Sequence, residues 1–176
     1  TKIFNNFTHP NFKKFAFNEN QGPYGTRSKA IDLAETDWYI QLDGDDLLPR
    51  NAIKTINTCI LENSKAEFIY GNCEYFSDNN TYIKLPSLNS DDLVAGPLFN
   101  AVSPININMF RKIGGFSNEL FINADWDFWL SVYENKICGH YTNTLLYKRR
   151  YRPDNIGSIY IDLRPKIIKL IIKRHP

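Results

Sequence analysis

The sequence predicts one α/β domain with a mixed, mostly parallel sheet flanked by helices. Apolar, strand-like runs alternate with helix-like segments along the chain, which is typical of strands joined by crossover helices. The first clear strand-like run ends in an acidic cluster, at the position where α/β sheets bind ligands. With 176 residues, of which 43% are hydrophobic and 14% aromatic, the chain can form one domain with its own core, and intrinsic disorder is not expected.

The expected elements of the first third follow from local residue patterns. Residues 18–26 are rich in Gly, Pro and Asn and are predicted to form a loop, followed by a short helix over 27–35 and a strand over 38–42. Pro49 is expected to begin a helix that runs to about Glu62, because the N–H that proline lacks has no partner in a first helical turn. The predicted apolar face of that helix consists of Ala52, Ile53, Ile56, Cys59 and Ile60.

The later elements are less regular. Four apolar runs are predicted to form strands, over residues 66–76, 80–86, 107–114 and 144–152. Two helices are expected, over residues 125–135 and 166–174, the second preceded by Pro165.

Charge is unevenly distributed although the net charge is only +2. Residues 147–176 carry nine basic and two acidic side chains, whereas 1–146 carry 12 basic and 17 acidic ones, so the C-terminal part is expected to face something anionic. Within it, 161–176 is predicted to form a basic amphipathic helix that lies on an anionic membrane or packs on its own domain. Its lysine stripe consists of Lys166, Lys169 and Lys173.

Cysteine usage and hydropathy indicate the cellular setting. The three cysteines include no CxxC pair, and their odd number argues against a disulfide framework, so a reducing, cytoplasmic location is expected. No stretch approaches the 18 uninterrupted apolar residues of a transmembrane helix, and the first ten residues do not resemble a signal peptide. Contact with the inner face of a membrane would therefore be peripheral.

The acidic cluster is the first candidate site. The apolar run 38–42 leads directly into Asp43, Gly44, Asp45 and Asp46. Carboxylates this close repel one another unless a cation lies among them, and Mg²⁺ and Mn²⁺ prefer oxygen ligands. A solvated turn in which Asp45 or Asp46 caps the following helix is the alternative, and the cluster alone does not separate the two.

A second candidate site lies in residues 114–134, where a Gly–Gly turn is followed by an acid at the start of a Trp-rich helix. On that helix Asp125, Phe128 and Trp129 are spaced to share one face. The alternative is that Asp125 is a first-turn acid favoured by the helix dipole, with Trp126 and Trp129 in the core.

Taken together, these segments resemble the family 2 glycosyltransferases, which have the GT-A fold. The family's "GxxxARNxGxxxA" helix is similar to "GTRSKAIDLA", and its "YIxFLDxDDxxxP" strand and metal motif to "WYIQLDGDDLLP". Its "GGFDE…EDWDLWLRL" segment is similar to "GGFSNELFINADWDFWLSV", and its "LLYYRxH…S" strand to "LLYKRRYRPDNIGS". The DxD motif is weak alone, but these motifs in this order, over roughly residues 20–158, are specific.

The chain departs from the family pattern at three places. Ala124 stands at the first acid of the family's Glu–Asp pair, and Ser28 at the Asn of its Arg–Asn pair. The family's initial "PxYN" strand and later "DDGS" strand end have no counterpart. Residues 1–160 are therefore expected to be the C-terminal two thirds of a GT-A domain, a partial domain without the first βαβ unit, followed by the helix of 161–176.

The resemblance implies an inverting enzyme that transfers a sugar from a nucleotide-diphosphate sugar to an acceptor hydroxyl. It implies that Asp45 with Asp43 binds Mn²⁺ or Mg²⁺, and that Asp125 is the catalytic base. Candidates for binding the donor, by guanidinium contacts to its diphosphate, are Arg27, Arg149, Arg150 and Arg152. Candidates for contact with the acceptor are Trp126, Trp129 and Asp127. Strand alternation places Arg150 and Arg152 on one face.

The expected partners follow from this reaction. The expected acceptor is a saccharide or lipid-linked saccharide, as in bacterial-type synthesis of surface polysaccharide, lipopolysaccharide or capsule. The transferred sugar is expected to be a hexose or N-acetylhexosamine. No nucleic acid partner is expected. One alternative is a catalytically inactive module that binds carbohydrate or nucleotide. A weaker alternative is a sugar-nucleotide nucleotidyltransferase, which the "GTR" of residues 25–27 suggests.

Overall fold

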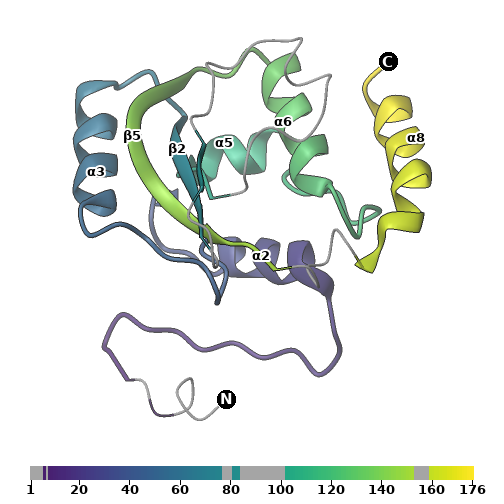
Figure 1. The fold of residues 1–176 in the computed structure, drawn as a ribbon, viewed down its shortest axis with the longest axis horizontal. Coiled ribbons are helices and arrows are strands. Elements are labelled where there is room, and N and C mark those ends of the chain that lie inside the picture. Colours follow the sequence, from purple (N-terminus) through teal and green to yellow (C-terminus); the bar gives the residue numbers. More distant parts are fainter. Residues whose placement is uncertain (1–5, 7, 77–80, 84–101, 153–158) are drawn as a thin grey trace.

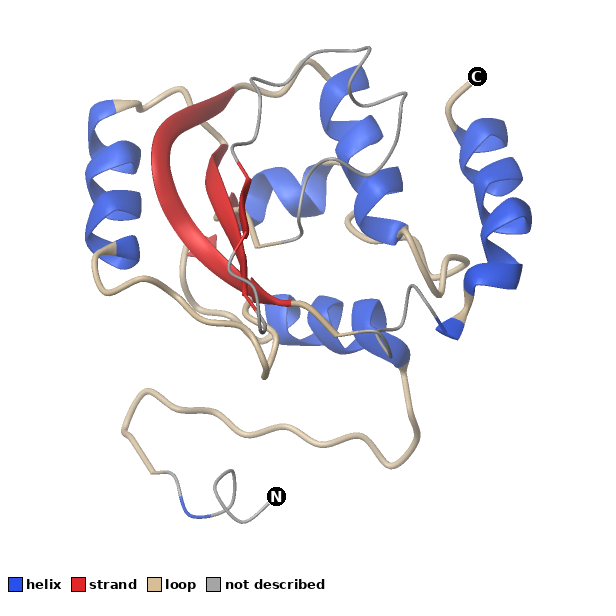
Figure 2. Cartoon of the chain, viewed as in Figure 1, coloured by secondary structure: helices blue, strands red, loops and turns tan. Residues whose placement is uncertain are grey.

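The computed structural model describes residues 6, 8–76, 81–83, 102–152 and 159–176, which form a mixed sheet with helices packed on it (Figures 1 and 2). The elements are α2 (Gly22–Asp32), β1 (Trp38–Tyr39), α3 (Ala52–Glu62), β2 (Phe68–Phe76), β3 (Thr81–Ile83), β4 (Ile105–Asn106), α5 (Ile107–Lys112), α6 (Ala124–Glu134), β5 (Gly139–Arg150), the 3₁₀ turn η1 (Ile161–Leu163) and α8 (Arg164–Arg174). The last residues of the predicted strand 80–86 lie outside the described part.

The sheet is mixed, as predicted, but it is not mostly parallel among the described strands. β1, β4, β2 and β3 follow one another across it, and each of these three pairings is antiparallel. Only β5 pairs in parallel, along β2 from Phe68↔Gly139 to Phe76↔Arg150. β3 follows β2 after only four residues, too few for the crossover that a parallel partner needs. β2 and β5 are therefore the parallel centre of the fold.

Helices cover both faces of this central pair. Figure 1 shows α3 on one side of β2 and β5, with α5 and α6 on the other. On the α6 side the core is aromatic: Phe68 and Trp129 are 0% and 1% exposed, and their ring centroids lie 5.1 Å apart. Truncating a ring of this size in a core costs about 3–5 kcal/mol, so α6 is held firmly on the sheet.

Several predicted boundaries are wrong. α2 begins at Gly22, five residues before the predicted start, and α3 begins at Ala52 rather than at Pro49. β1 covers two residues instead of 38–42, and the predicted apolar face of α3 fails at Ile53, which is 50% exposed. Residues 107–112 form α5 and not a strand, because the Asn106 side chain accepts the Met109 N–H at 3.1 Å and caps the helix.

The Gly–Gly turn after α5 requires glycine at its second position. Gly115 has a φ of 64°, and a Cβ on it would lie 2.6 Å from the Phe110 ring. Its N–H donates to the Phe110 carbonyl at 3.0 Å, which reverses the chain toward α6. The turn thereby places the start of α6 next to α2.

The C-terminal helix α8 packs on the same domain. Ile167 and Ile171 belong to the core that contains α6, whereas the lysines of the predicted stripe are exposed. Among the helices in the described ranges, none is both long enough and apolar enough to span a bilayer.

Candidate active site

The start of α2 brings two side chains of the candidate site onto one face. Gly22 has a φ of 67°, its N–H donates to the Asn20 side chain at 2.8 Å, and Pro23 follows at the start of the helix. Tyr24 and Arg27 are then three residues apart and neighbours on the helix surface. The Arg27 guanidinium lies over the Tyr24 ring, 5.1 Å from its centroid, so the aromatic face supports the cation.

Asp125, the predicted base, contacts this turn. The Tyr24 hydroxyl donates to Asp125 Oδ1 at 2.9 Å, and the Trp126 N–H donates to the same oxygen at 3.0 Å. Burial raises the pKa of Asp125 above its ordinary value, although both hydrogen bonds favour the charged form. A carboxyl group with a raised pKa, held in place by two donors, is suited to accepting a proton.

Asp43, the first acid of the cluster, contacts Arg27, the neighbour of Tyr24 on α2. Arg27 Nη2 donates to its Oδ1 and Oδ2 at 2.8 and 3.1 Å. A continuous chain of contacts therefore joins Asp125 to Tyr24, Tyr24 to Arg27, and Arg27 to Asp43. Residues from α6, α2 and the segment after β1 meet here.

The rest of the acidic cluster is bound to β5. The Asp46 carboxylate accepts the backbone N–H of Arg150 at 2.8 Å, and Leu47 and Lys148 exchange backbone hydrogen bonds. Asp46 is 8% exposed, and burial raises its pKa despite that N–H. Asp46 thus supports the loop by holding it to β5. Neither acid caps α3, whose N-cap is Asn51, so the capping alternative is wrong.

Three of the four predicted donor-binding arginines contact Asp43 or Asp45. Besides Arg27, Arg152 pairs with Asp45 Oδ2 at 3.0 Å, and Arg150 Nε donates to the Asp45 carbonyl at 3.2 Å. Both reach Asp45, in agreement with the predicted strand alternation. The Arg149 guanidinium lies 5.9 Å from the centroid of the Tyr75 ring, and its positive charge favours the ionised form of Asp46.

The acidic cluster offers hard oxygen ligands to a divalent cation, but few of them. In the described ranges no three His, Cys, Asp or Glu side chains are grouped to hold a metal ion. Asp43 and Asp45 have side chains that are 48% and 36% exposed, and their neutralising partners are arginines. This donor set fits a cation that takes its remaining ligands from water and a substrate's phosphates, the usual arrangement for Mg²⁺.

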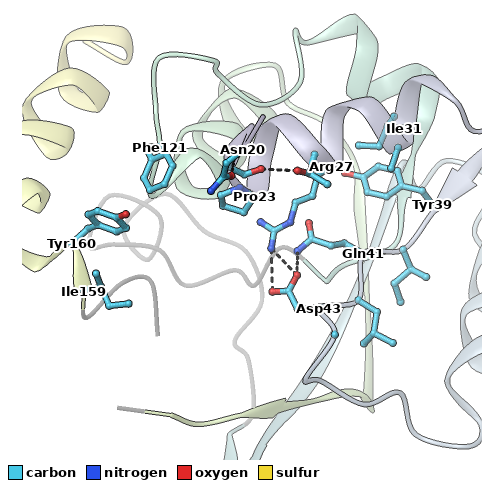
Figure 3. Close-up of a pocket in the computed structure, with 16 residues that line it drawn as sticks. Asn20, Pro23, Arg27, Ile31, Tyr39, Gln41, Asp43, Phe121, Ile159 and Tyr160 are labelled. Carbon is cyan, nitrogen blue, oxygen red and sulfur yellow. Dashed lines mark hydrogen bonds and ion pairs between the residues drawn. The ribbon is translucent and has the colours of Figure 1, made fainter. Parts of the chain in front are cut away.

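A cavity of about 810 Å³ opens beside Asp43 (Figure 3). Arg27, Gln41 and Asp43 form one wall, with the Gln41 amide directed toward the Asp43 carboxylate at 3.5 Å. Phe121 and Tyr160 form the other wall and contact each other edge to face, 5.0 Å between ring centroids. The cavity is large enough for a small charged ligand and is mostly apolar apart from the Arg27–Asp43 wall.

The predicted acceptor residues are not all available to a ligand. Trp129 is 1% exposed and packs on Phe68 and Phe128, so the prediction that its ring contacts a sugar is wrong. Asp127 is also 1% exposed, and Arg174 Nε donates to it, so this carboxylate joins α6 to α8 instead of facing an acceptor. Trp126 is 8% exposed and beside Asp125, and its role stays a prediction.

Sequence reasoning missed Tyr24 and Gln41. The helix was expected to begin at Arg27, which left Tyr24 in a loop and concealed its three-residue spacing from Arg27. Pro23 just after Gly22 was the signal for the earlier start. Gln41 interrupts the apolar run 38–42 with a polar residue that the structure buries, and that interruption was visible in the sequence.

The fold class is GT-A, with a mixed sheet, flanking helices and a cavity beside Asp43 in the segment after β1. Solved structures with a similar fold include Staphylococcus aureus TarS residues 1–349 in complex with UDP-GlcNAc, at a TM-score of 0.69 and 17% identity over 88% of this chain and 47% of that one. The same protein in complex with UDP has a TM-score of 0.65 and 16% sequence identity, over 88% of this chain and 45% of that one.

The chain belongs to glycosyl transferase family 2, whose family model matches residues 2–121. It is 28% identical over 121 residues to an uncharacterized glycosyltransferase of Haemophilus influenzae, an alignment of 64% of this chain and 41% of that protein. The chain thus spans less than half the length of these relatives.

Proposed function

We propose that this chain is the catalytic part of an inverting glycosyltransferase that uses a nucleotide-diphosphate sugar. The observation that carries the proposal is the chain of contacts from Asp125 through Tyr24 and Arg27 to Asp43. These contacts link a carboxyl group suited to proton transfer with the first carboxylate of the DxD motif, and this link supports the proposal. UDP and UDP-GlcNAc complexes of the structurally similar TarS support a nucleotide-sugar donor.

In the proposed reaction the acceptor oxygen attacks the anomeric carbon, and the bond from that carbon to the diphosphate oxygen breaks with its electron pair. The acceptor hydroxyl proton passes to the Asp125 carboxylate. Its raised pKa makes Asp125 a stronger base than an exposed aspartate, provided it is ionised at the working pH. Because attack and departure occur on opposite faces of the sugar, the anomeric configuration inverts.

Charge that develops on the leaving diphosphate needs cationic partners. Arg27, Arg150 and Arg152 are the candidates, because their side chains already contact the acidic cluster. Arg149 lies by Tyr75 and is the weakest of the predicted four. Asp45, with Asp43, would hold Mn²⁺ or Mg²⁺, which when bound neutralises diphosphate charge.

The setting we propose is synthesis of a bacterial-type surface polysaccharide, lipopolysaccharide or capsule in the cytoplasm. The transferred group would be a hexose or N-acetylhexosamine, and the acceptor a saccharide or lipid-linked saccharide. The exposed lysines of α8 offer electrostatic contact with an anionic membrane, since its apolar Ile167 and Ile171 are already used for packing.

The test is nucleoside diphosphate release by the full-length protein, incubated with a panel of nucleotide sugars, Mn²⁺ and saccharide acceptors. Asp45→Ala and Asp125→Ala should each reduce release by about 10²–10⁴-fold. Asp32→Ala, an exposed acid on α2, is the matched control and should leave release unchanged. Activity that survives both site substitutions would overturn the mechanism. Pyrophosphate release in a parallel incubation with a nucleoside triphosphate and a sugar 1-phosphate would indicate a nucleotidyltransferase, and donor binding without release of nucleoside diphosphate an inactive binding module.

A further inference from the structure

We propose that Tyr24 is a positioning residue that sets the catalytic base and the donor-side arginine relative to each other. This inference rests on the proposed function and deepens it. In the proposed reaction Tyr24 exchanges no proton with donor or acceptor and acts through Asp125 and Arg27. Tyr24 has two partners in this role. Its hydroxyl contacts Asp125, and the face of its ring contacts Arg27.

The hydroxyl contact orients the base. The Tyr24 hydroxyl and the Trp126 N–H both donate to Asp125 Oδ1, which fixes the plane of the carboxylate and leaves Oδ2 for the acceptor proton. Burial, and then the charge of Asp125, raise the pKa of Tyr24 far above its ordinary value. Tyr24 therefore stays protonated near neutral pH, and its hydrogen bond to Asp125 favours the ionised form of that carboxylate.

The ring contact orients the arginine. The Arg27 guanidinium lies 5.1 Å from the Tyr24 ring centroid, and its Nη2 spans both oxygens of Asp43. The Arg27 side chain is 17% exposed, so its position depends on the groups that enclose it. The two partners of Tyr24 belong to segments far apart in the chain, and one rigid side chain on the first turn of α2 joins them.

A packing role alone would predict different behaviour. The Tyr24 ring also packs on Phe116, with 5.3 Å between centroids. Tyr24→Phe keeps this contact and the cation–π contact but removes the hydroxyl, whereas Tyr24→Leu also removes the aromatic face. The two substitutions therefore separate the hydroxyl's effect on the base from the ring's effect on Arg27.

The experiment measures kcat, donor KM and the pH profile of kcat/KM for the full-length protein with its best donor from the panel above. Tyr24→Phe should lower kcat about 10-fold with little change in donor KM, because the base is less well oriented. It should also move the acidic limb of the profile to higher pH by about one unit, since the carboxylate has lost a donor. Tyr24→Leu should in addition raise donor KM several-fold.

Two controls keep the outcomes distinct. Tyr133→Phe, at a 43% exposed position on α6, should leave all three quantities unchanged. Asp125→Asn should abolish turnover; if it does not, the proposed function fails. If Asp125→Asn is inactive but Tyr24→Phe has the wild-type kcat and pH profile, the proposed function stands and the positioning role is wrong. A lower kcat with an unmoved acidic limb and a lower melting temperature would also overturn it in favour of packing.

Discussion

The Arg174 guanidinium, in the last turn of α8, donates through Nε to the buried Asp127 carboxylate of α6 at 2.6 Å. Arg174 Nη2 contacts the other oxygen at 3.3 Å, and His175 Nε2 lies 3.2 Å from the first. Asp127 follows Asp125, the proposed base, by two residues. Its side chain therefore lies on nearly the opposite side of α6. The C-terminal helix is thus attached to the helix that carries Asp125.

Removing Arg174 should destabilise the protein. Arg174→Leu leaves a buried carboxylate with only part of its charge compensation, and we expect a loss of about 1–2 kcal/mol in unfolding free energy after discounting for the half-exposed guanidinium. For a chain of this size that lowers the melting temperature by about 2–8 °C. Lys173→Leu, one residue away and exposed, is the matched control for thermal unfolding and should change little. Equal melting temperatures for both variants would contradict the attachment.

Asp125→Asn should make the protein inactive but more stable near neutral pH. The pKa of Asp125 is raised in the folded state because burial disfavours its charged form, so ionised Asp125 destabilises the fold above that pKa. Asparagine carries no charge, and we expect a gain of about 1 kcal/mol, or about 2–4 °C, at pH 7.

The pH dependence of this gain provides its check. As pH falls through the raised folded pKa and then the ordinary unfolded one, wild-type Asp125 becomes neutral and the difference between the two proteins should vanish. Thermal unfolding at a series of pH values measures it. A constant difference at all pH values would show that the substitution acts through packing.

The three thiols should differ in reactivity. Cys138 is exposed, whereas Cys59 is 7% and Cys73 0% exposed, and burial raises the pKa of Cys73 to about 11. Because the thiolate is the reactive form, iodoacetamide at pH 8 should add one label to the folded protein and three after denaturation, as counted by mass spectrometry. Cys138→Ser should take no label while folded. Rapid labelling of Cys73 in the folded protein would contradict its burial.

Metal removal should abolish activity, and the two DxD acids should not contribute equally. Arg27 already spans both oxygens of Asp43, whereas Arg152 contacts one oxygen of Asp45. We therefore expect Asp45→Asn to raise the Mn²⁺ concentration for half-maximal activity about 10-fold or more, and Asp43→Asn to raise it less. The measurement is Mn²⁺ titration after EDTA treatment, with Asp32→Asn as control. Full activity in excess EDTA would exclude the metal role proposed for Asp45.

Local patterns predicted some elements well and others poorly. The α6 helix was expected at 125–135 and is found at Ala124–Glu134, because its acids and aromatics repeat at helical spacing. The apolar run 107–114 fits a strand or a helix equally. It forms the helix α5 because Asn106 caps its start and the Gly–Gly turn follows its end. Strand direction was predicted least well, because pairing partners are set by long-range register that local alternation does not encode.

The sequence by itself indicated the family, which the family model confirms, and placed Asp43, Asp45 and Asp125 in the two motifs on which the proposed site rests. Tertiary structure alone decided which charges meet. Tyr24 and Asp125 are 101 residues apart, and Arg174 and Asp127 are 47 apart. Such pairs depend on how α2 and α8 pack against α6, and packing is decided by the whole core at once. Residue periodicity reports only which face of each element is buried, and so leaves those partners open.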